Sequence, residues 1–186
     1  MPNLLNDHSR EKLINLINYF VKNTKNCGKT KLFKLLYYAD FRHFKEMGRP
    51  ITGLKYYTWE KGPVPKELFF EMKQPKDDFN QTFAFTKTED DILKIMPRKT
   101  FDSRHFTKRE MRIIEDVAFI FKNAKAYEMV KCTHLPNDPW DATLKNKGKD
   151  KEIDYTLAFD NSSESISIEE YKRKLSEIDE IKGILS

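Results

Sequence analysis

The chain has 186 residues, of which 39% are hydrophobic and 13% aromatic, and its formal net charge is +5. The aromatic content is typical of folded rather than disordered chains, and no stretch approaches the roughly 20 apolar residues that span a bilayer. Two cysteines, Cys27 and Cys132, are too few for a disulfide framework. The N-terminal residues have neither a basic region nor a long apolar run, so we expect a cytoplasmic protein with one main domain.

The first two helices are predicted from apolar residues at helical spacing. One begins near Asp7 or Ser9 and ends at residues 26–28. The next follows Thr30, which has the side chain of an N-cap, and ends at Gly48, which suits a left-handed C-terminal residue. Leucines and aromatics cover most sides of this second helix, and a helix this apolar is normally central to its domain.

The turn between these helices contains Gly28-Lys29-Thr30, which invites interpretation as a phosphate-binding loop. Such a loop needs another glycine five residues earlier and a buried strand before it. The chain has Asn23 at that position and a predicted helix before it. We therefore interpret the tripeptide as a turn between helices.

The short segment 54–60 is aromatic and β-branched, which predicts a strand that ends at residues 61–63. Pro65 then suits the first turn of a short helix that runs to residues 74–75. The polar segment 76–81 is turn-like.

Segment 82–88 alternates apolar and polar residues as a strand does, and 92–96 is a second candidate strand. Acidic residues 89–91 form the turn between them. We expect a small β-hairpin here.

Three further helices have recognisable starts. Thr107 and Glu110 fit a capping box, and a shorter helix covers residues 126–132. Asp138 followed by Pro139 predicts an N-cap and the first residue of another helix.

Segment 145–154 alternates lysine with acid and is expected to be an exposed loop. After a polar connector at 161–165, Ser167 and Glu170 form another capping-box pattern that starts an amphipathic helix. This last helix either packs back on the domain, which we favour, or offers its apolar face to a partner. The fold class is therefore α+β, a helix-rich single domain with a small antiparallel β element.

A search for chemistry finds no metal or catalytic site. Cys132 and His134 are near each other in the sequence, but no second pair stands at ligand spacing. No nucleophile elbow is present, and no carboxylate pair lies in an apolar setting that would raise a pKa. We expect no cofactor and no enzymatic activity.

Two local clusters remain unusual. One is the run from Trp59 to Pro65, and the other combines Thr133-His134 with Pro139-Trp140. The structural interpretation is that these residues belong to the core. The functional alternative is that rigid Gly/Pro backbone displays Trp and His to a partner, since Trp is enriched at binding hot spots.

The order of these pieces resembles the Panacea domain family, the SocA-like antitoxins also described as GepA-like phage-associated proteins. The resemblance covers roughly residues 29–142 and rests on Lys34-Leu-Leu-Tyr-Tyr-Ala39, the Trp59–Pro65 run and the two late motifs. It implies that residues 1–160 form a Panacea-like domain and that 161–186 form an accompanying C-terminal helix. The motif positions, which we take as a partner-binding or structural core, are Tyr37, Tyr38, Trp59, Gly62, Pro63, Val64, His134, Pro139 and Trp140.

The resemblance further implies a protein-binding antitoxin that neutralises its cognate toxin by direct contact. The toxin is expected to be the product of the adjacent gene. At least one type in this family acts as an adaptor that hands its toxin to the ClpXP protease, so a ClpXP-type protease is a second expected partner. The family offers no catalytic residues and no cofactor.

Two alternatives stay open at this stage. The basic excess permits a nucleic-acid-associated prophage regulator, although no recognisable reading helix supports it and nucleic acid is not an expected partner. A small enzyme with a site at Trp59 and His134 is the other alternative. It predicts that His134→Ala removes a chemical activity rather than a complex.

Overall fold

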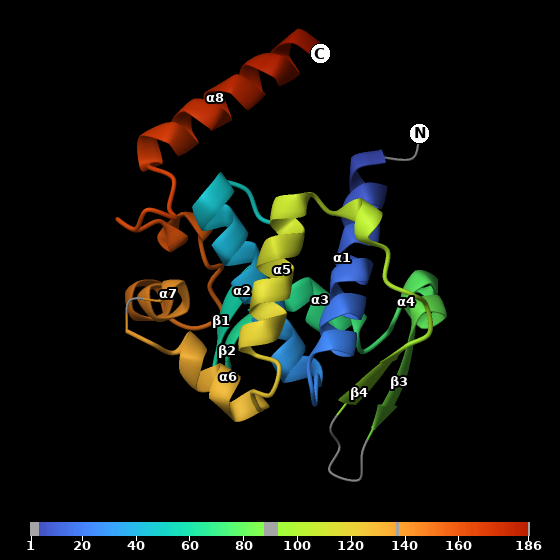
Figure 1. Cartoon of the computed structure of the whole chain (residues 1–186). Coiled ribbons are helices and arrows are strands. Elements are labelled where there is room, and N and C mark those ends of the chain that lie inside the picture. The colour runs from blue at the N-terminus through green and yellow to red at the C-terminus, as the bar shows by residue number, and fades with distance from the viewer. Residues whose placement is uncertain (1–3, 88–92, 137, 186) are drawn as a thin grey trace.

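The structure is a computed structural model that describes residues 4–87, 93–136 and 138–185. In this part of the chain, helices and two small antiparallel hairpins form a helix-rich α+β domain, as the sequence predicts (Figure 1). The helices are α1 Leu4–Asn23, α2 Lys29–Met47, α3 Lys66–Glu71, α4 Asp77–Thr82, η1 Ser103–His105, α5 Lys108–Ile120, α6 Ala126–Thr133, α7 Pro139–Lys147, η2 Tyr155–Ala158 and α8 Ile168–Leu185. The strands are β1 Tyr56–Trp59, β2 Gly62–Pro65, β3 Phe83–Lys87 and β4 Leu93–Pro97.

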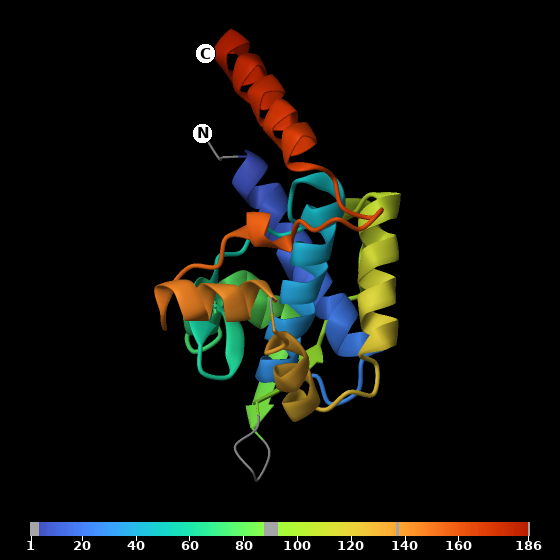
Figure 2. The ribbon, with the colours of Figure 1, turned by 90° about the vertical axis from the view of Figure 1, so that its left-hand side faces the viewer.

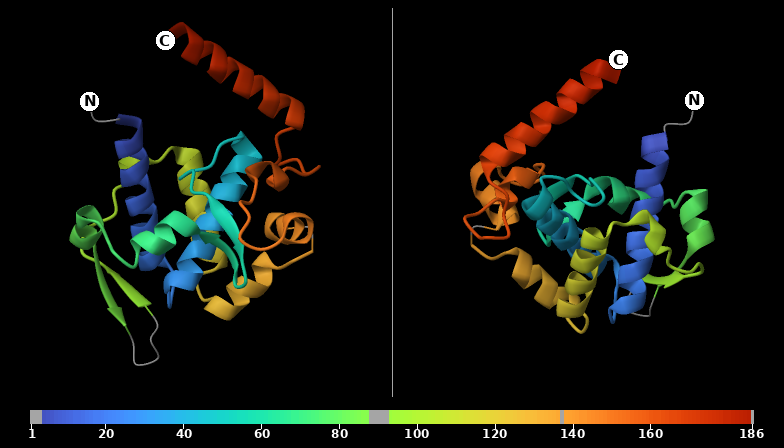
Figure 3. Two further views of the ribbon diagram at one scale, coloured as in Figure 1. Left: turned by 180° about the vertical axis from the view of Figure 1, so that it is seen from behind. Right: turned by 45° about the horizontal axis from the view of Figure 1, so that its top comes forward.

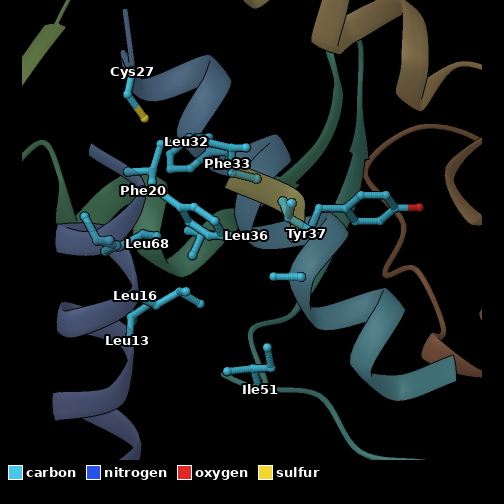
Figure 4. Packing of buried hydrophobic residues seen from close by; sticks show 14 of the residues in the cluster. Leu13, Leu16, Phe20, Cys27, Leu32, Phe33, Leu36, Tyr37, Ile51 and Leu68 are labelled. Carbon is cyan, nitrogen blue, oxygen red and sulfur yellow. The ribbon is translucent and has the colours of Figure 1, made fainter. Parts of the chain in front are cut away.

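Helix α2 is central, as its apolar surface predicts. It contacts α1, α5, α6, η2 and the strands β2 and β4. Leu32 and Leu36 of α2 belong to one core cluster with Leu16 and Phe20 of α1 and Leu68 of α3 (Figure 4). Almost every position from residue 31 to 44 of the helix is buried, so the domain is organised around it.

The C-terminal end of α2 is also as predicted, because Gly48 adopts φ +73° and donates its N–H to the carbonyl oxygen of Phe44. The predicted start is wrong by two residues. Gly28 is the N-cap and makes no side-chain cap, and Thr30 lies inside the helix. An antiparallel bridge between Gly28 and Lys94 holds the chain at this point, so tertiary pairing rather than a capping side chain sets the start.

The first hairpin is larger than the sequence indicates. Strand β1 lies within the predicted segment, but residues 62–65 form a second strand, and Trp59 pairs with Gly62. The run Gly62-Pro63-Val64-Pro65 has two prolines, which cannot donate to a ladder, so it does not read as a strand. Strand β2 tolerates the prolines because, among the described strands, it pairs with β1 alone and is therefore an edge strand. Pro65 precedes helix α3 as its N-cap rather than lying in its first turn.

The second hairpin pairs β3 with β4 and confirms the two predicted strands at residues 83–87 and 93–97. The predicted turn at 89–91 lies outside the described residues. The polar segment before this hairpin, expected to be turn-like, is instead the short helix α4. Its acidic first turn, with Asp77 and Asp78, suits a helix N-terminus, and Phe79 anchors it in the core. A single buried aromatic gives no periodicity from which such a helix could be predicted.

The starts of α5 and α7 are as predicted. Thr107 and Glu110 form a complete capping box, and the Asp138 side chain accepts the N–H of Trp140 with Pro139 as the first helical residue. The segment after α7 departs from the exposed loop that we expected. Glu152 bridges to Tyr57 and Ile153 is only 2% exposed, so this segment runs along the free edge of β1.

Helix α8 extends away from the rest of the molecule (Figures 1 and 2). Further views show the same arrangement from behind and from above (Figure 3). Tyr171 in its first turn contacts the rings of Phe44 and Phe159. The division into a domain of residues 1–160 and a helix within 161–186 stays a prediction. Among the helices of the described residues, none combines the length and apolarity that crossing a bilayer requires.

Candidate functional site

The motif residues of the sequence come together against the first half of α2. Strands β1 and β2, the end of α6 and the start of α7 supply them. Lys34 of α2 is 1% exposed, and its Nζ donates a 2.7 Å hydrogen bond to the carbonyl oxygen of Pro63. Burial away from water lowers the pKa of Lys34 to about 7. This bond ties the hairpin to the central helix.

Gly62 is required at its position by the close approach of three elements. Its φ is +91°, in the region that favours glycine. A Cβ atom there would lie 2.7 Å from Oγ1 of Thr133 and 2.9 Å from Nζ of Lys34. The hairpin, α2 and the end of α6 therefore meet at a point that has no room for a side chain.

Tyr37 connects α2 to the start of α7. Its hydroxyl donates to Oδ1 of Asp138 at 2.7 Å, and the same oxygen accepts the backbone N–H of Trp140. Burial raises the pKa of Tyr37 well above its ordinary value and also raises that of Asp138. The N-cap of α7 is thus also its attachment to the central helix.

The two tryptophans and His134 form a second connection. His134 stacks face to face on Trp140 with ring centroids 3.9 Å apart, and Trp140 donates its Nε1–H to the carbonyl oxygen of Trp59 at 3.3 Å. Nε2 of His134 is buried and has no hydrogen-bond partner among the described residues. Burial lowers the pKa of His134, and nearby Lys34 lowers it further. Burial and the nearby charge of Lys34 therefore favour a neutral imidazole.

The nine motif positions divide by exposure. Those that are buried and join elements of the fold are Tyr37, Gly62, Pro63, Val64 and Trp140. Those that reach the surface in part are Tyr38, Trp59, His134 and Pro139. Only the second group is placed to touch another molecule in the folded domain.

A cavity of about 320 Å³ opens beside the partly exposed motif residues. We call it the motif groove, and it is lined by Tyr37, Tyr38, Phe41, Arg42, Lys45, Asp138, Pro139, Ala158 and Glu164. Arg42 and Lys45 are already paired, with Asp116 and Asp160 respectively. The groove thus offers aromatic walls and charges of both signs, which suits side chains of a protein partner.

The surroundings of Trp59 are a second exposed feature. Its ring meets that of Phe69 edge to face at 4.9 Å, and its Nε1–H donates to Asp150. Phe70, which is 51% exposed, continues this aromatic surface, and Nζ of Lys73 lies 5.5 Å from the centre of its ring. Aromatic and cationic groups of this kind are common in protein interfaces.

The reactive side chains Cys27 and Lys34 are both buried. Within the described part of the chain, no group of three or more His, Cys, Asp or Glu side chains is placed to hold a metal ion. Burial raises the pKa of the Cys27 thiol to about 11, so it is not an activated nucleophile. Lys34, whose pKa is near neutral, is enclosed and bonded to Pro63.

The sequence does not identify three residues that matter to this cluster. Lys34 stands in a helix motif, where a lysine inside an apolar stripe is a sign of a buried cation. Thr133 stands beside His134, and its contact with Gly62 is visible only in the fold. Asp150, whose backbone φ is +54°, accepts the indole N–H of Trp59. This contact depends on the path of the chain after α7, which the sequence does not reveal.

Comparison with known proteins gives one match. The family model described as "Antitoxin SocA-like, Panacea domain" matches residues 32–141, which is more than half of the chain. The matched segment runs from α2 to the first turn of α7 and contains all nine motif positions. No curated protein and no solved structure matches the chain.

Proposed function

The chain belongs to the family of SocA-like antitoxins with a Panacea domain, and from this we propose that it is the antitoxin of a toxin–antitoxin pair. It neutralises a cognate toxin by direct contact in the cytoplasm. The family match over residues 32–141 is the observation that carries the proposal.

We further propose that the contact surface includes the motif groove and the edge of Trp59. The buried motif residues hold α2, the first hairpin and α7 in fixed positions. The partly exposed ones, Tyr38, Trp59, His134 and Pro139, then lie on a rigid support. A preorganised aromatic surface loses little side-chain entropy on binding, which favours affinity. The net charge of +5 favours a partner with an acidic face, chiefly by speeding encounter.

Co-expression with the product of the adjacent gene tests the antitoxin role. We expect the neighbour alone to arrest growth, and this protein to restore growth and to co-purify with it. Toxin that persists at a constant level in the complex indicates masking, whereas toxin that disappears only in cells with an active ClpXP protease indicates delivery to it. A harmless neighbour that does not co-purify contradicts the proposal.

A matched pair of variants tests the proposed surface. Tyr38 and Tyr19 are both partly buried tyrosines that pack on a phenylalanine, Tyr38 on Phe121 at 4.9 Å and Tyr19 on Phe101 at 5.0 Å. Only Tyr38 lines the motif groove. We expect Tyr38→Ala to abolish growth rescue and co-purification, and Tyr19→Ala to retain both at a similar melting temperature. Equal loss in both variants indicates a stability effect and contradicts the assignment of the groove.

A further inference from the structure

Helix α8 is attached to the domain at its base. The N–H of Ile166 donates to the carbonyl oxygen of Lys45 at 3.0 Å, and Tyr171 packs on Phe44 with ring centroids 5.3 Å apart. A Cβ at Gly48 would lie 2.9 Å from Cδ1 of Ile166 and 3.0 Å from Cδ2 of Tyr171, so the connection is close. Beyond this base the helix extends away from the other elements (Figures 1 and 2).

Part of the apolar stripe of this helix is exposed. Ile168 is 52% exposed and Leu175 is 42% exposed. In the sequence, Ile168, Tyr171, Leu175 and Ile178 follow one another at spacings of three, four and three residues. That spacing is the seam of a pair of helices that pack side by side.

The charges of α8 are arranged in blocks. Lys172, Arg173 and Lys174 form a basic turn, and Glu177, Asp179 and Glu180 form an acidic turn that follows it. A helix with this order is complementary to a second copy of itself only when the two run antiparallel. In a parallel pair, like charges would face each other, which is unfavourable.

Two charged residues of α8 have no ion pair within the part of the chain that the structure describes. Arg173 pairs with Glu177, and Lys174 pairs with Glu170, within the same helix. Lys172 and Asp179 have no ion-pair partner among the residues that the structure describes, and both are exposed. They are seven residues apart, so they flank the apolar stripe at equivalent positions.

We propose that two copies of this chain associate through an antiparallel pairing of their α8 helices. Leu175 lies at the centre of the contact, and Lys172 of each copy pairs with Asp179 of the other. With 18 residues, α8 is about 27 Å long, and an antiparallel pair places the two domains at opposite ends of it. The exposed apolar residues of α8 are thus covered by a second copy rather than by this chain's own domain. This pairing does not depend on binding of the toxin.

Sedimentation velocity of the full-length protein over a range of concentrations tests this pairing. Wild type is expected to show a reversible monomer–dimer equilibrium. Lys172→Asp places two like-charge pairs across the two-fold interface and is expected to raise the dimer dissociation constant about tenfold. Arg173→Asp makes the same charge change on the same helix, but away from the stripe, and is the matched control with little effect.

A charge exchange makes the test specific. Asp179→Lys alone is expected to weaken the dimer as Lys172→Asp does. The double variant with both changes is expected to restore the dimer, because each intermolecular pair then again joins an acidic and a basic residue, with their positions exchanged. Leu175→Glu is expected to give monomers whose domain unfolds at a similar temperature. A wild-type monomer at all concentrations, equal effects of Lys172→Asp and Arg173→Asp, or a double variant no tighter than the single ones would each overturn the proposal.

Discussion

The ammonium group of Lys34 lies 2.7 Å from the carbonyl oxygen of Pro63, inside the domain, and no carboxylate of the described residues is among its hydrogen-bond partners. A backbone carbonyl satisfies one donor of this lysine but does not neutralise a charge. Burial consequently lowers its pKa to about 7, the result expected for a cation removed from water. The charge of Lys34 is thus linked to the attachment of the first hairpin to α2.

The first prediction concerns this lysine and pH. Its pKa is about 7 in the folded protein and about 10.4 in an unfolded chain. Between these values the unfolded state binds more protons, so the contribution of Lys34 to the free energy of unfolding rises with pH, by up to about 4 kcal/mol. Lys34→Met lacks this rise. Urea unfolding of both proteins from pH 7 to 10 measures it, and parallel stability curves would contradict the prediction.

Gly62 provides the second prediction through a comparison with Gly148. Both have positive φ, +91° and +88°, but a Cβ at Gly148 meets nothing within 4 Å. Gly148→Ala is expected to cost about 2 kcal/mol from backbone strain alone, because its φ of +88° and ψ of −166° lie in a region almost restricted to glycine. Gly62→Ala adds the clash with Thr133 and Lys34 and is expected to cost about 2 kcal/mol more than Gly148→Ala. Equal losses in chemical denaturation would show that the close approach does not contribute.

The third prediction concerns Asp40, which is fully buried and accepts hydrogen bonds from Thr52 and from the hydroxyl of Tyr56. Burial raises its pKa to about 6. Since the folded state then binds the proton more tightly than the unfolded state, this group's contribution to stability falls as pH rises from about 4 to 6, by about 3 kcal/mol. Asp40→Asn removes that fall.

The comparison of wild type with Asp40→Asn isolates this group from carboxylates that titrate in the opposite sense. Asp78 is one of these, because its hydrogen bond from Arg10 lowers its pKa. The difference in free energy of unfolding between the two proteins should therefore change between pH 4 and 6 and be constant above 7. A difference independent of pH would mean that Asp40 titrates normally in the folded state.

A fourth prediction uses fluorescence to report on the stacked pair. In a Trp59→Phe variant, Trp140 is the sole tryptophan and lies 3.9 Å from the ring of His134. A protonated imidazole quenches indole emission, so acidification should lower the fluorescence. Because burial lowers the pKa of His134, the midpoint should lie below its ordinary value of 6.5. The additional change His134→Gln should remove the transition, and its persistence would assign the quenching to another group.

The fifth prediction tests the domain division. Removing residues 163–186 takes away α8 and the contacts of Tyr171 with Phe44 and Phe159. The remaining domain should still unfold in one cooperative transition, with a melting temperature a few degrees lower, and Tyr171→Ala in the full chain should reproduce that decrease. Loss of cooperative unfolding in the truncated protein would show that the helix is an integral part of the core.

The sequence by itself predicts the parts of this fold whose physics is local. The apolar stripe of α2, the glycine that ends it, the Thr107–Glu110 capping box and the Asp138–Pro139 helix start each depend on neighbours a few residues away. The β3–β4 hairpin follows for the same reason, since the alternation of apolar and polar residues is a local signal of a strand. The spaced motifs also indicate the family, which the match over residues 32–141 confirms.

Tertiary structure alone decides the features that depend on distant partners. Strand β2 exists because β1 pairs with it despite two prolines, and α4 exists because Phe79 finds the core. Trp140 is buried whereas Trp59 is partly exposed, and three elements meet at Gly62. Both features arise where segments far apart in sequence come together. Local patterns determine which helices and turns form, whereas the burial of a lysine or the exposure of a tryptophan depends on what the rest of the chain places against it.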